Sequence, residues 1–547
     1  MAALDEITGT LGLSKASHLL RRLTFGATRP EVDTFSSKTI SQALDILLSP
    51  LTVPAPPVDL KTGNSWIAPT TQNSSESDLR QYFRCWLYGL MYKSGTNATE
   101  KLTFFLHTNF TAIAAVIDKS TALYYQNQLL RKYATGNIKE LALKICTDNA
   151  MLVLLDNRLN EYVKPNENFA REFFELFTIG KGPEIGAGNY STYTEQDIQA
   201  AAKVLSGWNT DFTYSNIDPL TGIPSGKLKV NSSNLAFKHD VGIKTFSPAF
   251  DNIEIKPSAV SGSFATTAAA TQELKEFVNM VFSKRATALN ICRKIYRFFV
   301  YYRITDQVEA NVISPMADNL IANNYVLKPV FEMLFKSQHF FDEDDAVTSN
   351  NAKGAIIKSP LEVTIGMMKY FEISLPESSS DLTKYYTEVG SVIDAMVDQG
   401  FDLYEPLDVA GYDAYFQAPL YNRNWISPNF LARRYQFAQY LLEGKNNLGK
   451  PSVLKIDAIQ FVKQVANISD PSDGNLLAKE LIDYLLPESI TDDRTTYFRN
   501  ILLDNLSLIN WKNEWNNYQS SGNDMAIRTQ INAFLNAVLQ SAEYQLS

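Results

Sequence analysis

The stretch PNENFAREFFELFTIGKG, residues 165–182, mixes charged and aromatic residues with the spacing of an α-helix. At about 100° per residue, its apolar side chains fall on one broad arc and its polar side chains fill the rest. The apolar arc holds Phe169, Ala170, Phe173, Phe174, Leu176 and Phe177, and the polar arc holds Glu167, Asn168, Arg171, Glu172 and Glu175. A helix of this kind packs one face against a core. The stretch therefore predicts a helix over residues 166–179.

The polar face of this helix has two interpretations. Arg171 stands four residues after Glu167 and four before Glu175, so its guanidinium can bridge both carboxylates. The face is then a solvated, salt-bridged surface, where each exposed pair contributes only about 0.3–0.5 kcal/mol. Alternatively, Glu172 and Glu175 act as acid and base in a site where Arg171 holds an anion. Spacing within one helix leaves both interpretations open.

Helical periodicity recurs along most of the chain. Its clearest examples are residues 77–93, 98–113, 121–133, 137–146, 194–207, 286–302, 361–371, 429–442 and 527–544. Two segments depart from it: 49–75, rich in Pro, Thr and Ser, and 209–262, where short alternating runs such as 227–230 predict a small β-hairpin. We predict a mainly α fold, a large multi-helix body in which 1–208 and 263–547 pack together and 209–262 is a β-containing excursion.

Composition and charge narrow the classes of protein. The 547 residues are 45% hydrophobic and 20% charged, which is typical of globular proteins. A net charge of -9 without a basic cluster argues against nucleic-acid binding, because phosphate neutralisation needs grouped Lys and Arg. The three cysteines, Cys85, Cys146 and Cys292, lie far apart in apolar patterns, which favours buried thiols over disulfides or metal ligands.

Two features of the sequence bear on localisation. No run of about eighteen apolar residues occurs, so we predict no transmembrane segment. Arg21 and Arg22 have a superficial likeness to a twin-arginine export signal, but the polar, Pro-containing residues 26–38 follow where such a signal needs an apolar run. The sequence as written predicts a cytoplasmic protein.

Histidines mark two further candidate positions. His107, in KLTFFLHTNFTA, falls between Phe104 and Phe110 on the helical wheel, so it is either a buried core histidine or a ligand or proton-transfer group. In FKHDVGIKTF, His239 and Asp240 stand in a loop, where polar side chains held by a rigid scaffold commonly build sites. An enzyme or ligand-binding protein would bring His107, Arg171, Glu175 and this loop into one pocket.

Seven blocks in order resemble the bacterial domain-of-unknown-function 1800 family over nearly the whole chain. They are HLLRRLTFGATRPEVD, FFLHTNF, PNENFAREFFELFTIGKG, YTEQDIQAAAKVLSGWN, HDVGIKTF, LYEPLDVAGY and SAEYQLS. The resemblance places His18, His107, Arg171, Glu172, Glu175, Asp197, Trp208, His239 and Asp240 on recurrent family positions. It also implies a partner related to alkaline phosphatases and sulfatases, and export together with that signal-bearing partner as an alternative to a cytoplasmic location.

The same resemblance bears on metals and on function. Asn109 stands where family members often have a second histidine, which weakens a metal site built on that pair, and the pattern identifies no metal and no cofactor. We expect an accessory or partner protein with a polar central site. The alternatives are a hydrolase-like enzyme that uses His and carboxylate groups, and a glycan-binding module whose exposed aromatic residues in 402–425 stack on sugar rings.

Overall fold

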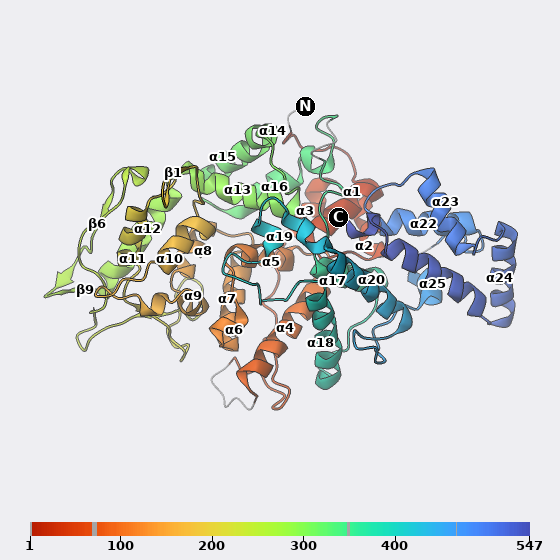
Figure 1. Cartoon of the computed structure of the whole chain (residues 1–547), viewed down its shortest axis with the longest axis horizontal. Helices are drawn as coiled ribbons and strands as arrows, with labels where there is room; N and C mark the ends of the chain where they lie inside the picture. Colours follow the sequence, from red (N-terminus) through yellow and green to blue (C-terminus); the bar gives the residue numbers. More distant parts are fainter. Residues whose placement is uncertain (1–2, 68–73, 347–350, 466–467) are drawn as a thin grey trace.

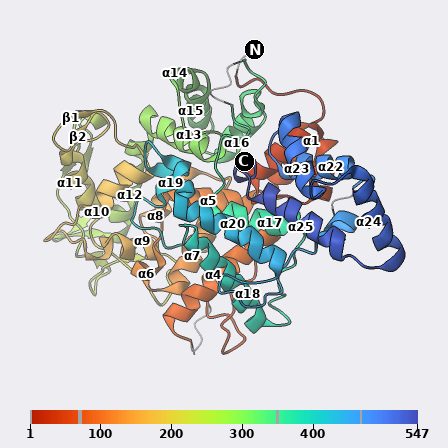
Figure 2. The same cartoon turned by 45° about the vertical axis from the view of Figure 1, so that its right-hand side comes forward.

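A computed structural model describes residues 3–67, 74–346, 351–465 and 468–547 of the chain. Helices dominate these residues and the strands are few and short, so the predicted mainly α fold is confirmed. Figures 1 and 2 show an elongated molecule with the strands at one end and the last helices of the chain at the other. None of the described helices combines the length and the apolar character needed to cross a membrane.

The first part of the chain is helical, and several of its helices begin at a capping box. Thr28 with Glu31 opens α2, and Thr39 with Gln42 opens α3, so that side chains satisfy the free N–H groups of the first turn. The helices are α1 (Gly12–Leu23), α2 (Arg29–Ser36), α3 (Ile40–Leu47), α4 (Glu76–Lys93), α5 (Thr99–Asn109), α6 (Ala114–Ile117), α7 (Ser120–Lys132), α8 (Ile138–Ile145), α9 (Asn149–Leu154), α10 (Asn168–Glu172) and α11 (Glu195–Val204). The Pro-rich segment between α3 and α4 forms no helix in its described residues; residues 68–73 lie outside them.

The helix predicted over 166–179 is present but changes its geometry midway. α10 passes into the π-helix η2 (Phe173–Phe177), and Gly180, at φ 74°, ends the segment with its N–H donating to Phe174 O at 2.8 Å. A π-turn joins residue i to i+5, so side chains four apart across it no longer stand above one another. Such turns are frequent at functional sites.

The β-containing excursion is built from short antiparallel pairs. β3 (Trp208–Asn209) pairs with β4 (Lys227–Leu228), β6 (Lys244–Thr245) with β7 (Glu254–Ile255), and β9 (Phe264–Thr266) lies between β5 (Leu235–Ala236) and β8 (Val260–Ser261). β1 (Glu184–Gly186) and β2 (Asn189–Tyr190) form a separate hairpin after η2. The alternating run at 227–230 thus supplies a strand, although its partner lies far earlier in the chain.

The remaining helices complete one continuous core. Buried apolar residues from Ile7 to Tyr544 form a single cluster, and Arg21 on α1 donates to the Tyr370 hydroxyl and to Tyr484 O. The helices are α12 (Thr267–Phe282), α13 (Arg285–Phe299), α14 (Asp306–Val308), α15 (Ser314–Ala322), α16 (Leu327–Phe335), α17 (Pro360–Tyr370), α18 (Leu382–Asp398), α19 (Asp413–Phe416), α20 (Pro428–Glu443), α21 (Ala458–Gln460), α22 (Gly474–Leu485), α23 (Asp492–Leu502), α24 (Leu508–Ser521) and α25 (Met525–Leu539). The three cysteines are free and buried, as predicted.

Candidate functional site

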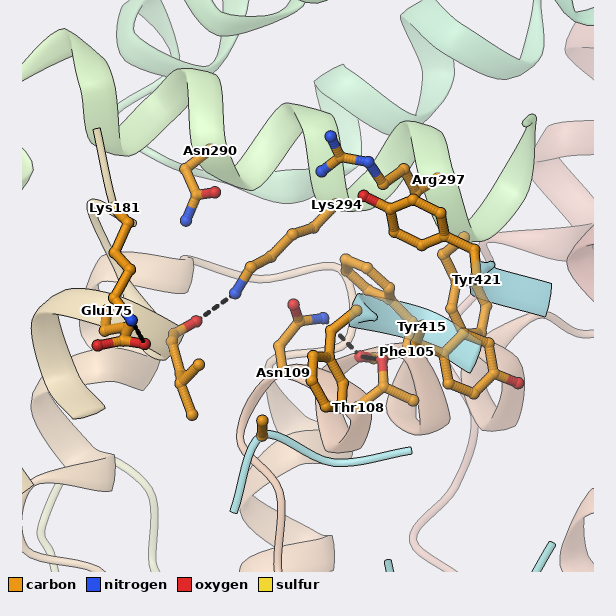
Figure 3. Close-up of a pocket in the computed structure, with 14 residues that line it drawn as sticks. Phe105, Thr108, Asn109, Glu175, Lys181, Asn290, Lys294, Arg297, Tyr415 and Tyr421 are labelled. Atoms are coloured by element: carbon orange, nitrogen blue, oxygen red, sulfur yellow. Dashed lines mark hydrogen bonds and ion pairs between the residues drawn. The ribbon is translucent and has the colours of Figure 1, made fainter. Parts of the chain in front are cut away.

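A cavity of about 260 Å³ lies where α5, η2, α13 and α19 meet (Figure 3). Its walls come from four segments that are far apart in the sequence, and they mix cationic, amide, hydroxyl and aromatic side chains. The lining residues are Phe105, Thr108, Asn109, Glu175, Leu176, Lys181, Asn290, Lys294, Arg297, Phe298, Ala410, Tyr415, Phe416 and Tyr421.

Helix α13 presents two cations to this cavity. Asn290, Lys294 and Arg297 follow one another at spacings of four and three, which places them on one helical face. The Lys294 ammonium donates to the carbonyl oxygen of Leu176 in η2, and the Arg297 guanidinium lies 5.5 Å from the ring centroid of Tyr421. Neither forms an ion pair with a carboxylate in the described part of the chain, and Arg297 Nε is buried without a hydrogen-bond partner.

The opposite wall carries a compensated pair. Lys181 forms an ion pair with Glu175, whose carboxylate also accepts a hydrogen bond of 3.3 Å from the Tyr193 hydroxyl. Three cations therefore face the cavity with one carboxylate, which leaves an excess of positive charge in a partly desolvated place. Such a site attracts anions.

Burial is the main cause of the pKa shifts of the two cations on α13. It lowers the pKa of Lys294 to about 8, with the neighbouring positive charge of Arg297 as the second cause. Burial also lowers the pKa of Arg297. A bound anion would relieve both effects, because it would stabilise the charged forms.

Of the six residues proposed from the sequence, Glu175 alone lines this cavity. Glu172 is half-buried beside it; burial, and then the charge of Glu175, raises the pKa of Glu172 to about 7. Arg171 forms a two-pronged ion pair with Glu195 at 2.7 and 3.1 Å, and its distance to Glu167 is 3.6 Å. The predicted bridge from Arg171 to Glu175 is wrong, because the π-turn between them rotates Glu175 toward Lys181.

His107 lies in the aromatic core. It is 1% exposed, and its ring stacks on Tyr404 with centroids 3.8 Å apart. Neither ring nitrogen has a hydrogen-bond partner within the described ranges, and burial lowers the pKa of His107 to about 3, so the ring is neutral. This geometry favours the core interpretation, while Asn109, two residues on, reaches the cavity instead.

The His239 loop forms a sealed polar cluster away from the cavity. His239 contacts Ser206 O at 2.9 Å through Nδ1 and Glu273 at 2.5 Å through Nε2. Lys244 donates to the same carboxylate at 2.7 Å and to Asp240 O at 2.6 Å. Because His239, Lys244 and Glu273 are fully buried, the cluster ties the excursion to α12. The structure does not bring the six predicted residues into one pocket.

Sequence reasoning missed the cations of α13. Asn290, Lys294 and Arg297 share one face of the predicted helix 286–302. This polar spacing is the feature of the sequence from which the site could have been predicted. Larger cavities of about 440 and 460 Å³ lie beside Trp208 and Tyr124. Lys144 and Arg131 in their walls are paired with Asp218 and Glu100, and the lysines there without a carboxylate partner among the described residues, Lys132 and Lys275, are exposed. Among the described residues, no three His, Cys, Asp or Glu side chains group to hold a metal ion.

Comparison with known proteins gives one match. The model of the family described as "Protein of unknown function (DUF1800)" matches residues 18–546. No curated protein and no solved structure matches the chain.

Proposed function

Because the chain belongs to the DUF1800 family, whose function is unknown, we propose a function from its own cavity: the protein binds a small organic anion between α5, η2, α13 and α19. Lys294 and Arg297 carry this proposal. They stand on one face of α13 and line the cavity, and neither has a carboxylate partner among the residues that the structure describes. Cations held in a partly dry site without counter-charges bind anions more strongly than exposed ones.

The walls indicate the chemical class of the anion. A phosphate, sulfate or carboxylate group fits Lys294 and Arg297, because a guanidinium matches such groups in a planar fork. Tyr415, Phe416 and Tyr421 form an aromatic wall that suits a ring or an apolar body. The polar ends of Thr108 and Asn109, on α5, complete the opposite side (Figure 3).

Calorimetric titration of the full chain with inorganic phosphate, sulfate and phenyl phosphate tests this function. We expect Arg297→Gln to weaken binding at least about tenfold, or about 1.4 kcal/mol. Arg293→Gln is the matched control, since Arg293 lies one turn earlier on α13 and pairs with Glu309 outside the cavity. Equal affinities of the two variants, or no binding by the unaltered chain, would contradict the proposal.

The accessory role with a phosphatase- or sulfatase-like partner is the second part of this proposal. It is supported by exposed apolar side chains in the segment that contributes Ala410 and Phe416 to the cavity: Leu407 is 90% exposed, and Leu420 and Phe416 are also exposed. The aromatic residues expected at the surface over 402–425 divide into two groups: Tyr404, Tyr412 and Trp425 are buried in the core, whereas Phe416 is exposed and Tyr415 and Tyr421 are half-buried. The glycan-binding alternative loses the three buried rings, whereas a protein partner could cover the exposed aliphatic side chains.

The hydrolase-like alternative is supported by Glu172. A carboxyl group with a pKa near 7 can both donate and accept a proton at neutral pH. Glu172 lies close enough to Glu175, the carboxylate that lines the cavity, for the Glu175 charge to raise its pKa.

A further inference from the structure

Lys294 differs from the other lysine of the cavity in its surroundings. Lys181 pairs with the Glu175 carboxylate, whereas the Lys294 amine donates to a neutral backbone carbonyl, Leu176 O. Figure 3 shows its side chain extended from α13 across the cavity, with the nitrogen in the middle of the lining residues. An amine placed in this way is accessible to a ligand, and no carboxylate of the described residues forms an ion pair with it.

The charged groups around this amine make its neutral form more accessible than that of an exposed lysine. Arg297 follows it on the same helix face, and Glu175 and Lys181 from the η2 segment neutralise each other. Arg293, its neighbour in sequence, is paired with Glu309, and Tyr415 and Tyr421 line the wall beyond Arg297. The pKa of about 8, set by burial and by Arg297, agrees with this arrangement. Desolvation beside a second cation is a known way to make a lysine nucleophilic.

We infer that Lys294 is a nucleophile that condenses with the carbonyl group of a small anionic aldehyde or ketone held in this cavity. This inference rests on the proposed anion-binding function and adds a reactive group to the ligand class. Arg297 would hold the anionic group, and Lys294 Nζ would face the carbonyl carbon one helical turn away.

The condensation balances without an oxidant or reductant. The lone pair of Lys294 Nζ forms a bond to the carbonyl carbon, and the C=O π pair moves to oxygen, which takes a proton and gives a carbinolamine. The nitrogen then forms the C=N bond as the C–O bond breaks. The oxygen leaves as water with the two hydrogens of the original amine, and the product is an imine. Water reverses the reaction, so a stable product requires trapping.

Borohydride trapping with pyridoxal phosphate as the probe tests the inference on the full chain. This compound combines an aldehyde, a ring and a phosphate, and reduction converts its imine into a stable adduct that peptide mass mapping can locate. We expect labelling of Lys294 to exceed that of any other lysine by at least about tenfold. Labelling should rise with pH and level off no lower than about pH 9, since the pKa of the free amine is about 8 and a bound phosphate group would raise it.

Two variants separate charge from reactivity. Lys294→Arg keeps the positive charge but cannot form an imine, so it should retain phosphate binding and lose the adduct. Lys284→Arg is the control, because Lys284 lies next to the start of α13 and pairs with Asp251 outside the cavity. It should label like the unaltered chain. If Lys294→Arg does not fold, the peptide map of the unaltered chain still decides the outcome.

The outcomes distinguish this inference from the proposed function. Phosphate binding with labels spread over surface lysines overturns the inference and leaves the anion site standing. An adduct at Lys294 that phosphate does not suppress supports the nucleophile but overturns anion binding. An adduct at Lys294 that phosphate suppresses supports both, and the absence of phosphate binding and of the adduct overturns both.

Discussion

Glu172 is a carboxyl group whose ionisation is opposed by its surroundings. Its folded-state pKa is about 7 against an ordinary value of 4.5, so between these pH values the folded protein binds more protons than the unfolded chain. The free energy of unfolding therefore falls as pH rises from about 4.5 to 7. Replacement of the ionising group by a neutral amide should remove this loss.

We expect Glu172→Gln to gain about 1 kcal/mol of stability relative to the unaltered chain between pH 5 and pH 8, after allowance for partial exposure. Thermal unfolding at the two pH values measures it. Glu184→Gln, on the exposed strand β1, is the control and should show no such gain. A difference that is the same at pH 5 and pH 8 for Glu172→Gln would contradict the raised pKa.

At the scale of the element, η2 depends on Gly180. This residue adopts φ 74°, and a Cβ added to it would lie 2.8 Å from Asn290 Cγ on α13. The glycine thus permits both the end of the π-turn and the close approach of the helix that carries Lys294 and Arg297. Gly188 lies in the β1–β2 turn at φ 70°. A Cβ added there would lie 3.8 Å from the Glu195 carboxylate, which is an ordinary contact.

Gly180→Ala should cost more stability than Gly188→Ala, and chemical denaturation measures both. Each substitution forces alanine into the left-handed region, at about 1 kcal/mol. Gly180→Ala adds the clash with Asn290 and should lose at least a further 1 kcal/mol, roughly the cost of overpacking. Asn290→Ala should restore that additional part. An equal loss of stability for the two substitutions would mean that α13 shifts to accommodate the added methyl group without strain.

Regular helices were predictable, and their interruptions were not. The segments expected at 77–93 and 429–442 correspond to α4 and α20 within a residue or two, because apolar period and capping residues fix such elements locally. The π-turn was hidden, since Phe173, Phe174 and Phe177 are apolar on an α-helical wheel too. That turn directs Glu175 toward Lys181. The predicted pairing of Glu175 with Arg171 was therefore wrong because of the geometry of the helix, and not because of the residue itself.

At the scale of the whole molecule, the exposed side chains near α19 offer a surface for a partner. We expect Leu407→Asp to reduce co-purification with a co-expressed phosphatase- or sulfatase-like neighbour. Leu448→Asp is the control, because Leu448 is 69% exposed in the loop after α20. Both variants should keep the melting temperature of the unaltered chain, since neither side chain is buried. Equal recovery of the neighbour with both would exclude this surface.

The candidate cavity was beyond sequence reasoning because no local pattern states which helices meet. Asn109, Lys181, Lys294 and Tyr421 are ordinary polar residues of their own segments, and tertiary packing alone makes them neighbours. The His239 loop shows the reverse. Its residues looked reactive in sequence, yet Glu273, from a helix further along, seals them in the core.

The origin of the cavity walls has a consequence during protein synthesis. Asn109 and Lys181 leave the ribosome long before Tyr421, so an incomplete chain has the floor and the cations but lacks the aromatic wall. A ligand that requires that wall would stabilise only those chains in which the late segment has packed onto α5 and α13. Ligand bound in the cavity would then favour completely folded chains, in which the early and late segments are in contact.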